Sequence, residues 1–194
     1  MNKPTKYVLF LDIETTGIPI TNNGNHDFTD NFKYDSSRIV SIAWILCDFK
    51  QNIIKKDYYI IKPKNFVIHN NKFHGITNVY ALAYGTKITS IFKLLRKLDD
   101  EYKFEFIISH NLDFVMNILY NEMYRCEYNR LLNIFQSKTQ KCMGILSKND
   151  LKLNKTPTLN EINKYCFKKN MNKLYDAEYD VDTMMRSFFY LLHN

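Results

Sequence analysis

Short apolar runs separated by polar stretches dominate the first third of the chain. Residues 7–11 are apolar and acidic residues follow them at once, which is the pattern of a buried strand that ends at a turn. Residues 39–46 form a second apolar run, and residues 57–61 form a third that ends before Pro63. The polar residues 48–52 indicate a turn between them. The pattern therefore predicts an antiparallel meander of three strands.

The rest of the chain favours helices, with one further strand among them. Thr158 and Glu161 have the spacing of a capping box, which marks the start of a helix. The other predicted elements are helices over residues 88–98, 114–124 and 180–192 and a strand over residues 104–109. A meander followed by alternating helices and strands predicts a single α/β domain over residues 1–194.

Two polar segments are predicted to be loops. Residues 18–37 include the sequence N-N-G-N at 22–25 and predict a loop that is long for a compact domain, which suggests a functional edge. The sequence H-G-I-T at residues 74–77 predicts a turn before a helix.

Composition narrows the class of protein without naming a function. The chain has 194 residues, 45% of them hydrophobic, which suits one domain with a sizeable core. Its net charge of +7 is compatible with a phosphate-rich partner. Solvated surface lysines explain the charge equally well, because Asn, Lys, Ile, Tyr and Phe are over-used as in the A+T-rich genomes of some viruses and parasites. No signal peptide or membrane span is predicted.

The cysteines do not suggest a metal site or a disulfide framework. Cys47, Cys126, Cys142 and Cys166 form no C-x-x-C pair and have no His at zinc spacing. We therefore expect four reduced thiols in an intracellular, cytoplasmic protein. Because the over-used residues are typical of A+T-rich viral genomes, this cytoplasm could be that of a virus-infected host cell.

Candidate chemistry begins with the hexapeptide D-I-E-T-T-G, which follows the first predicted strand. A period of two places Asp12 and Glu14 on the same face. Neighbouring carboxylates repel unless a proton or a cation lies between them, and oxygen ligands of this kind suit Mg²⁺ or Mn²⁺. Thr15, Thr16 and Gly17 would let the backbone turn close to a ligand. The alternative is a strand end with two solvated acids.

This hexapeptide resembles the first motif of the DnaQ-like (DEDD, His-type) 3′–5′ exonucleases. Family members also carry H-N-x-x-F-D in the middle of the chain and H-x-x-x-x-D before the last helix. The resemblance covers nearly the whole chain, with further landmarks at H-G-I-T, R-I-V and K-C-M. It implies a ribonuclease-H-like α/β fold, in which parallel strands extend the antiparallel three-strand meander and helices flank the mixed sheet.

The second family motif is incomplete. His110, Asn111 and Phe114 match it, but Val115 occupies the position of the Asp. Asp113 lies two residues early, and two residues turn a helix by about 200°, so its side chain would reach the site only after a register slip. The alternative for His110 and Asn111 is a polar turn in which Asn111 or Asp113 caps the helix.

The third motif is incomplete as well. Asp180 matches the metal-binding Asp, whereas Tyr175 occupies the position of the His that acts as general base. A sister branch uses Tyr as the base with the spacing Y-x-x-x-D, but Tyr175 has one residue more before Asp180 and is a substituted His. An unperturbed Tyr titrates near pH 10, which favours Tyr175 as a loop aromatic packed on the last helix.

The resemblance implies two-metal hydrolysis of terminal phosphodiesters. Asp12 would bridge both ions, and Glu14 and Asp180 would hold the ion that activates the attacking water. With Val115 in place of the Asp, the second ion would lose a ligand. If that ion does not bind, only one ion is retained. Loss of the base at Tyr175 typically costs about 10²–10⁴-fold in rate.

The expected function is thus a weakened 3′–5′ exonuclease that uses Mg²⁺ or Mn²⁺ on single-stranded DNA or RNA 3′ ends. The resemblance also implies that Thr15, Thr16 and Gly17 contact the terminal nucleotide, with His110 and Asn111 across the cleft. The alternative is a catalytically inactive relic that binds nucleic acid or a protein partner through the same cleft.

Overall fold

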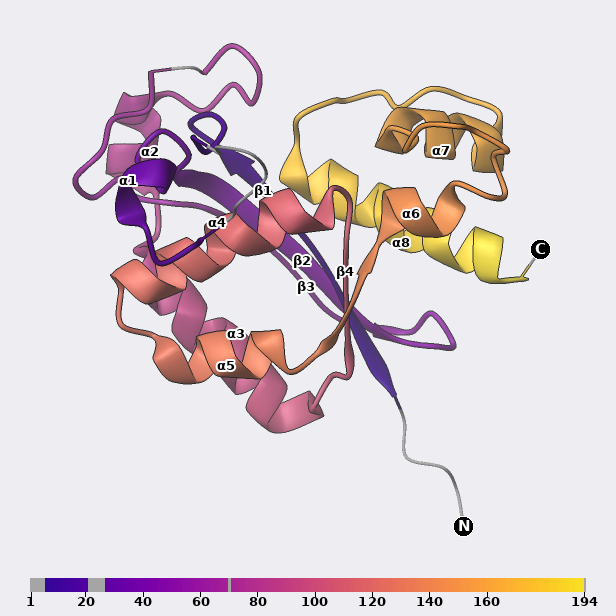
Figure 1. Ribbon diagram of the computed structural model, residues 1–194, viewed down its shortest axis with the longest axis horizontal. Helices are drawn as coiled ribbons and strands as arrows, with labels where there is room; N and C mark the ends of the chain where they lie inside the picture. The colour runs from indigo at the N-terminus through magenta and orange to yellow at the C-terminus, as the bar shows by residue number, and fades with distance from the viewer. Residues whose placement is uncertain (1–5, 21–26, 70, 194) are drawn as a thin grey trace.

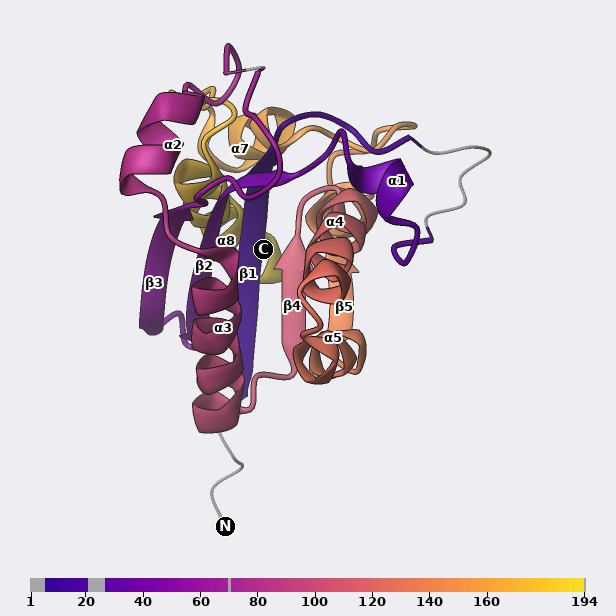
Figure 2. The ribbon, with the colours of Figure 1, turned by 90° about the vertical axis from the view of Figure 1, so that its left-hand side faces the viewer.

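The computed structural model describes residues 6–20, 27–69 and 71–193, so the predicted N-N-G-N turn at 22–25 lies outside the described residues. Within them, one mixed sheet has the strand order β3-β2-β1-β4-β5 (Figure 2). The strands are β1 (Tyr7–Thr15), β2 (Ile39–Asp48), β3 (Ile53–Ile60), β4 (Phe106–Ser109) and β5 (Thr139–Cys142). The first three pair antiparallel, and β1, β4 and β5 run parallel. The predicted mixed sheet is confirmed.

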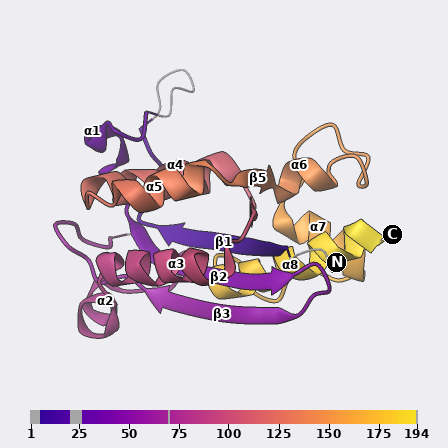
Figure 3. The ribbon, with the colours of Figure 1, turned by 90° about the horizontal axis from the view of Figure 1, so that it is seen from below.

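Helices cover both faces of this sheet. α3, α4 and α5 lie on one face, and α6, α7 and α8 lie together on the other (Figures 1 and 3). The helices are α1 (Asn31–Tyr34), α2 (Asn78–Tyr84), α3 (Ile88–Tyr102), α4 (Leu112–Arg125), α5 (Asn129–Gln136), α6 (Met143–Ser147), α7 (Leu159–Phe167) and α8 (Ala177–His193). Among the described residues, none of these helices combines the length and the apolarity that a membrane crossing requires.

The central strand β1 is fixed from both sides. Leu9 and Leu11 are buried in the core beneath α3, α4 and α5, whereas Val8 and Phe10 are buried in the core beneath α8. This alternation is the period of two that any strand imposes on its side chains. The next even-numbered residue is Asp12, so the strand directs its first acid toward the α8 face.

Several element bounds differ from the predictions. β3 begins at Ile53 rather than at residue 57, because backbone pairing with β2 continues past the exposed Lys55 and Lys56. α8 begins at Ala177 rather than at residue 180, which places Asp180 inside its first turn. Part of the predicted loop over residues 18–37 is the short helix α1, whose Tyr34 is fully buried.

The strand β5 has no hydrophobic signature. Its sequence T-Q-K-C is half exposed, and it pairs by backbone hydrogen bonds with β4 alone. Apolar periodicity detects strands with a buried face, so it misses a strand of this kind. The capping box of α7 is confirmed, since Thr158 and Glu161 exchange both hydrogen bonds.

A buried ion pair joins the sheet to α4. Arg38, just before β2, donates to Glu122 of α4 through Nε at 2.7 Å and through a terminal nitrogen at 3.1 Å. The Glu122 side chain is 2% exposed and that of Arg38 is 12% exposed. A two-pronged contact of this kind fixes the orientation of both partners. It thereby holds the last turn of α4 next to Arg38, whose backbone carbonyl accepts the Thr16 N–H just after β1.

Breaking this pair should destabilise the fold strongly. Glu122→Leu leaves the Arg38 charge buried and unpaired, which should lower the free energy of unfolding by about 3–5 kcal/mol. The double variant Arg38→Met with Glu122→Leu removes both charges, so its free energy of unfolding should fall clearly less. Urea unfolding of the three proteins measures this difference, and equal losses in the single and double variants would contradict the account.

Candidate metal centre

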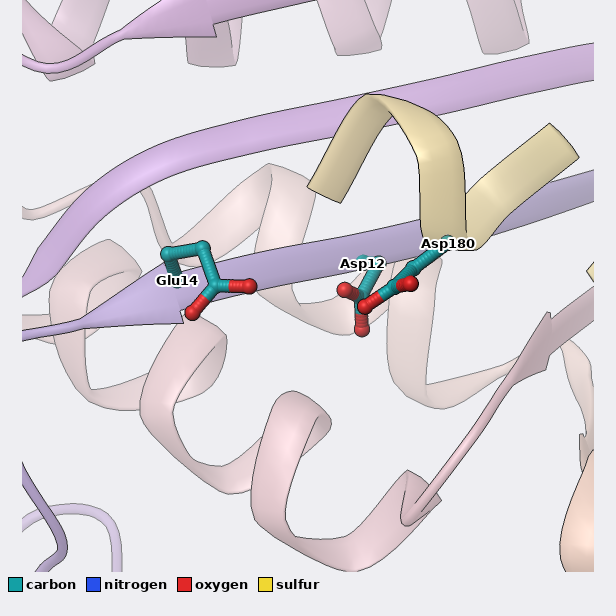
Figure 4. Close-up of side chains that lie close together, drawn as sticks. All are labelled: Asp12, Glu14 and Asp180. Atoms are coloured by element: carbon teal, nitrogen blue, oxygen red, sulfur yellow. The ribbon is translucent and has the colours of Figure 1, made fainter. Parts of the chain in front are cut away.

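Three carboxylates converge at one end of β1. Asp12 and Glu14 come from the strand and Asp180 comes from the first turn of α8, and one ligand oxygen from each lies within 4.8 Å of the others. Figure 4 shows the carboxylates of Asp12 and Asp180 facing one another, with that of Glu14 turned toward them. The expectation that these three acids meet at one edge of the sheet is confirmed.

Packing of α8 on the sheet brings Asp180 to this place. Val181 and Met184 of α8 are fully buried in the core that also contains Val8 and Phe10. The Asp180 N–H donates to the Asp176 carbonyl, which closes the first turn of the helix. Because Val181 is anchored against the sheet, the preceding side chain is held beside the end of β1.

The electrostatics of the cluster are unfavourable to three free charges. Burial, followed by the charges of Asp180 and Glu14, raises the pKa of Asp12 well above its ordinary value. Burial and the neighbouring Asp180 and Asp176 raise the pKa of Glu14 to about 7. Burial and Asp176 raise the pKa of Asp180 to about 7. The cluster therefore attracts a proton or a cation at neutral pH.

Asp176 is a fourth acid that the sequence analysis did not assign. Its Oδ1 accepts the Tyr179 N–H at 3.1 Å, so it caps α8, and its charge contributes to the raised pKa values of Glu14 and Asp180. An acidic residue directly before a helix is a capping signal, but the predicted helix started at residue 180 rather than at Ala177, so this signal was missed. Asp176 increases the negative potential around the cluster.

The donor set fits a divalent cation that prefers oxygen. Asp180 Oδ1 is buried and has no hydrogen-bond partner among the described residues. Two oxygens on opposite sides of an ion, with bonds of about 2.1–2.4 Å, are about 4.2–4.8 Å apart. The three ligand oxygens all lie within 4.8 Å of one another, so small side-chain adjustments suffice to bring them to one ion. Asp12, Glu14 and Asp180 can together hold one such ion.

The turn after the acids is built by hydrogen bonds within the chain. Thr15 Oγ1 and Ser37 Oγ both donate to the Gly17 carbonyl, and Thr16 Oγ1 donates to the Ser36 carbonyl. A Cβ on Gly17 would lie 2.9 Å from the Ser36 oxygen, so glycine is needed for the close approach of these two backbone segments. The contact of this turn with a ligand stays a prediction.

The second-motif residues lie at the start of α4. His110 is partly buried, with a buried Nδ1 that has no partner among the described residues, and Asn111 is exposed. Asn111 is the N-cap residue of α4, as the alternative expected, but its backbone is left-handed (φ 52°) and its side chain makes no capping bond. Asp113 is exposed and lies outside the acidic cluster.

Val115 is part of the apolar core. Its side chain is 2% exposed and belongs to the same buried cluster as Leu11 and Ile13, the β1 residues that alternate with Asp12 and Glu14. A carboxylate at this position would have to leave the apolar cluster or bind a cation. That Val115 stands at a lost metal-ligand position stays a prediction.

Tyr175 lies on the surface just before Asp176. Its side chain is 52% exposed, and its ring packs edge-on against Phe73 with centroids 5.3 Å apart. Phe73 belongs to the segment that precedes α2, so the partner of Tyr175 differs from the predicted last helix. The backbone of Tyr175 is left-handed (φ 59°).

A cavity borders the turn at Thr16. This cavity of about 620 Å³, here called the Arg38 cavity, is bordered by Thr16, Arg38, Lys64, His69 and Arg125. Arg38 is paired with Glu122, and Arg125 is paired with Asp35 at 2.7 Å. Most of the positive charge at this cavity is therefore already neutralised.

Comparison with known proteins identifies the fold. Neither a family model nor a curated protein matches the sequence. The structure is similar to E. coli exonuclease I in its zinc-bound complex with single-stranded DNA, with a TM-score of 0.74 at 18% identity over 97% of this chain and 41% of that chain. It is also similar to a 3′-exonuclease solved for 3′-end recognition of a histone mRNA stem-loop, with a TM-score of 0.66 at 13% identity over 99% and 84% of the two chains.

These similarities show that the chain shares the fold of the two exonucleases, a mixed sheet flanked by helices. The chain spans 41% of the length of exonuclease I and 84% of the length of the histone mRNA exonuclease. At identities below one fifth, the likeness extends to the fold, whereas chemistry has to be argued from the site itself.

Divalent metal should stabilise the protein through this cluster. At a free Mn²⁺ concentration of 100 times Kd, the free energy of unfolding should rise by about 2.7 kcal/mol. Asp12→Asn should abolish the effect, and Asp113→Asn, which removes an exposed acid outside the cluster, should preserve it. Thermal melts with a Mn²⁺ titration measure this, and an undiminished effect in Asp12→Asn would refute the assignment.

Without metal, stability should fall as the pH rises. The pKa values of Glu14 and Asp180 increase from 4.5 and 3.8 to about 7 on folding, so between these values the folded state binds more protons than the unfolded state. The free energy of unfolding therefore decreases from about pH 4 to pH 7. A loss of about 1 kcal/mol lowers the melting temperature by about 2–4 °C in a chain of this size.

Calorimetric melts in EDTA across this pH range test the decline. Asp12→Asn removes one of the repelling charges, so its melting temperature should exceed that of the parent above pH 7 in EDTA. Saturating Mn²⁺ should remove the decline in the parent. A parent protein whose stability increases toward pH 7 in EDTA would show that the three carboxylates do not repel one another as described.

Proposed function

We propose that this chain is a DnaQ-like 3′–5′ exonuclease domain of the DEDD His type, with degenerate second and third motifs and a reduced rate. It hydrolyses terminal phosphodiesters of DNA or RNA in a metal-dependent reaction. The observation that carries the proposal is the convergence of Asp12, Glu14 and Asp180 within 4.8 Å. The similar structures with this fold are 3′-exonucleases, which supports the same reaction class.

Each carboxylate has a distinct role in the proposal. Asp12, the most buried of the three, would be a ligand of the ions, and Glu14 and Asp180 would help to hold the ion that activates the attacking water. Mg²⁺ or Mn²⁺ bound there would neutralise the carboxylates and the phosphate and would lower the pKa of water. The raised pKa values of Glu14 and Asp180 support a cluster that at neutral pH becomes fully charged when a cation binds.

Single-stranded 3′ ends are the proposed substrate. Exonuclease I is solved with single-stranded DNA, and the histone mRNA exonuclease is described by its recognition of an RNA 3′ end. Thr15, Thr16 and Gly17 would contact the terminal nucleotide, and His110 and Asn111 would contact it from the start of α4. The net charge of +7 supports an anionic partner.

The proposed rate is low because two positions lack their usual chemistry. Val115 is buried in the apolar core and offers no ligand to a second ion. Tyr175 packs against Phe73 and carries no imidazole to accept the proton of the attacking water. The two losses act on one catalytic unit, so their effects on the rate should not multiply fully.

An inactive relic is the second candidate, and α2 provides an observation in its favour. Val79 and Tyr84 are 77% and 74% exposed, and Tyr80 packs against Tyr84 on the same helix with ring centroids 4.9 Å apart. Exposed apolar and aromatic side chains gathered on one helix are typical of protein-contact surfaces. A relic would use such a surface while the acidic cluster binds metal without turnover.

Digestion of labelled single strands decides between the two candidates. The proposal expects slow shortening from the 3′ end in Mg²⁺ or Mn²⁺, and no shortening by Asp12→Ala or by either protein in EDTA. DNA and RNA strands are assayed in parallel. Metal binding without any shortening, at enzyme concentrations in excess of substrate, would establish the relic.

Restoring the two lost groups should raise the rate. Val115→Asp with Tyr175→His supplies a carboxylate and an imidazole, and the general base alone is typically worth about 10²–10⁴-fold. Val115→Asn with Tyr175→Phe is the control, because it changes the same positions without adding either group. A restored variant that folds, binds Mn²⁺ and stays as slow as the control would contradict the assignment of these positions.

A further inference from the structure

A second cavity lies on the same edge of the sheet as the acidic cluster. β1, β4 and β5 run parallel, so their carboxyl ends share this edge. Asp12 and Glu14 are near the end of β1, His110 directly follows β4, and Cys142 is the last residue of β5. Adjacent strands are about 4.8 Å apart, so β5 ends about 10 Å from β1. The edge can therefore accommodate an extended chain that continues past the cluster.

This cavity, here called the β5 cavity, has a volume of about 610 Å³. The first turn of α4 forms one wall with Leu112, and α6 forms the facing wall with Ile145 and Leu146. Ile145 is 67% exposed and Leu146 is 39% exposed, although neither is at a chain end. Apolar walls that stay open to solvent offer a surface for a flat, weakly hydrated group such as a nucleobase.

The polar groups of the β5 cavity favour an anion. Lys141 is exposed and lines the cavity, and no carboxylate of the described residues lies within ion-pair distance of its amine. Lys141 is the basic residue of the lining, and the adjoining segment 141–158 contains three further Lys and one Asp, with Lys155 paired to Glu161. Asp113 is the acid of the lining, and it is exposed at the start of α4. A phosphate near Lys141 would form an ion pair with an amine that has no carboxylate partner among the described residues.

His110 connects this cavity to the acidic cluster. It lines the cavity, and its buried Nδ1 has no partner among the described residues. A Cβ on Gly144 would lie 3.2 Å from His110 Cε1 and 2.6 Å from Thr156 Cγ2, so glycine lets α6 approach both side chains closely. The wall of the cavity beside Gly144 is therefore tightly packed, and His110 places a buried, unpaired nitrogen within that wall.

The Arg38 cavity is a weaker candidate for the same ligand. Its arginines are already paired with Glu122 and Asp35. It also lies on the α4 side of the turn at Thr16, whereas Asp12 and Glu14 face α8. An anionic strand would find less uncompensated charge there than beside Lys141.

We propose that the β5 cavity binds one nucleotide unit of a single strand whose 3′ end lies at the acidic cluster. The base contacts Leu112, Ile145 and Leu146, and the phosphate lies near Lys141. This inference rests on the proposed function, because it assumes that a strand is bound at the cluster. It adds a subsite that distinguishes an oligonucleotide from a mononucleotide.

Cysteine protection tests the subsite directly. Cys142 lines the β5 cavity and Cys126 lines the Arg38 cavity, and both are free and half-buried, whereas Cys47 and Cys166 are buried. A phosphorothioate oligothymidylate at ten times its Kd should slow alkylation of Cys142 about tenfold by mass action. Alkylation of Cys126 should be unchanged, and thymidine 5′-monophosphate, which fills the cluster alone, should protect neither. Mass spectrometry of the full chain with Mg²⁺ present quantifies each thiol.

The outcomes separate this proposal from the proposed function. Protection of Cys126 in place of Cys142, or protection of neither while fluorescence anisotropy shows that the oligonucleotide is bound, overturns the subsite and leaves the function standing. Absence of any oligonucleotide binding overturns both. Absence of shortening in the digestion assay, together with protection of Cys142, retains the subsite in a relic.

A charge variant gives an independent measurement. Lys141→Gln should reduce the slope of log K against log salt for a single strand by about 0.7, the contribution of one phosphate contact. Lys93→Gln, on the exposed side of α3, makes the same change in net charge and should leave the slope unaltered. The Mn²⁺-dependent rise in melting temperature should be the same in both variants. Equal slopes for the two variants would exclude Lys141 as a phosphate contact.

Discussion

The mutual repulsion of Asp12, Glu14 and Asp180 is the constraint on which the rest of this site depends. Their ligand oxygens lie within 4.8 Å of one another in a partly buried place, where uncompensated charges are costly. The two apolar cores that enclose β1 provide the free energy that holds them there. Because β1 is packed on both faces and α8 is packed on the sheet, the acids cannot separate by backbone movement, and a cation is the natural way to relieve the repulsion.

Val115 and Tyr175 change this site in different ways. Val115 extends the apolar core up to the start of α4, which avoids burying another charge. Tyr175 makes a surface contact with Phe73 and carries neither a carboxylate nor an imidazole. Neither residue adds a charge to the folded protein, and under the proposed assignment neither supplies the group that the reaction would use at its position. The proposed low rate and the relic hypothesis both rest on the absence of a carboxylate at residue 115 and of an imidazole at residue 175.

The similar structures show how much sequence can change while the fold is kept. A TM-score of 0.74 at 18% identity means that the path of the chain is retained although most side chains differ. Alternation in β1 and helical spacing in α3 and α8 suffice for this path, because many apolar side chains of suitable volume can fill the same core. The ion pair between Arg38 and Glu122 adds a specific link that apolar packing alone does not provide.

The sequence by itself determined the meander, the place of β1 in the chain and the pairing of Asp12 with Glu14, because these follow from local periodicity. It also identified Asp180 through a motif, although nothing local shows that residues 168 positions apart share a site. Only the tertiary structure decided that β5 exists, that Val115 belongs to the core, that Tyr175 packs on Phe73 and that a cavity opens beside Lys141. Those features depend on contacts between distant segments, and such contacts leave no periodic signal in the chain.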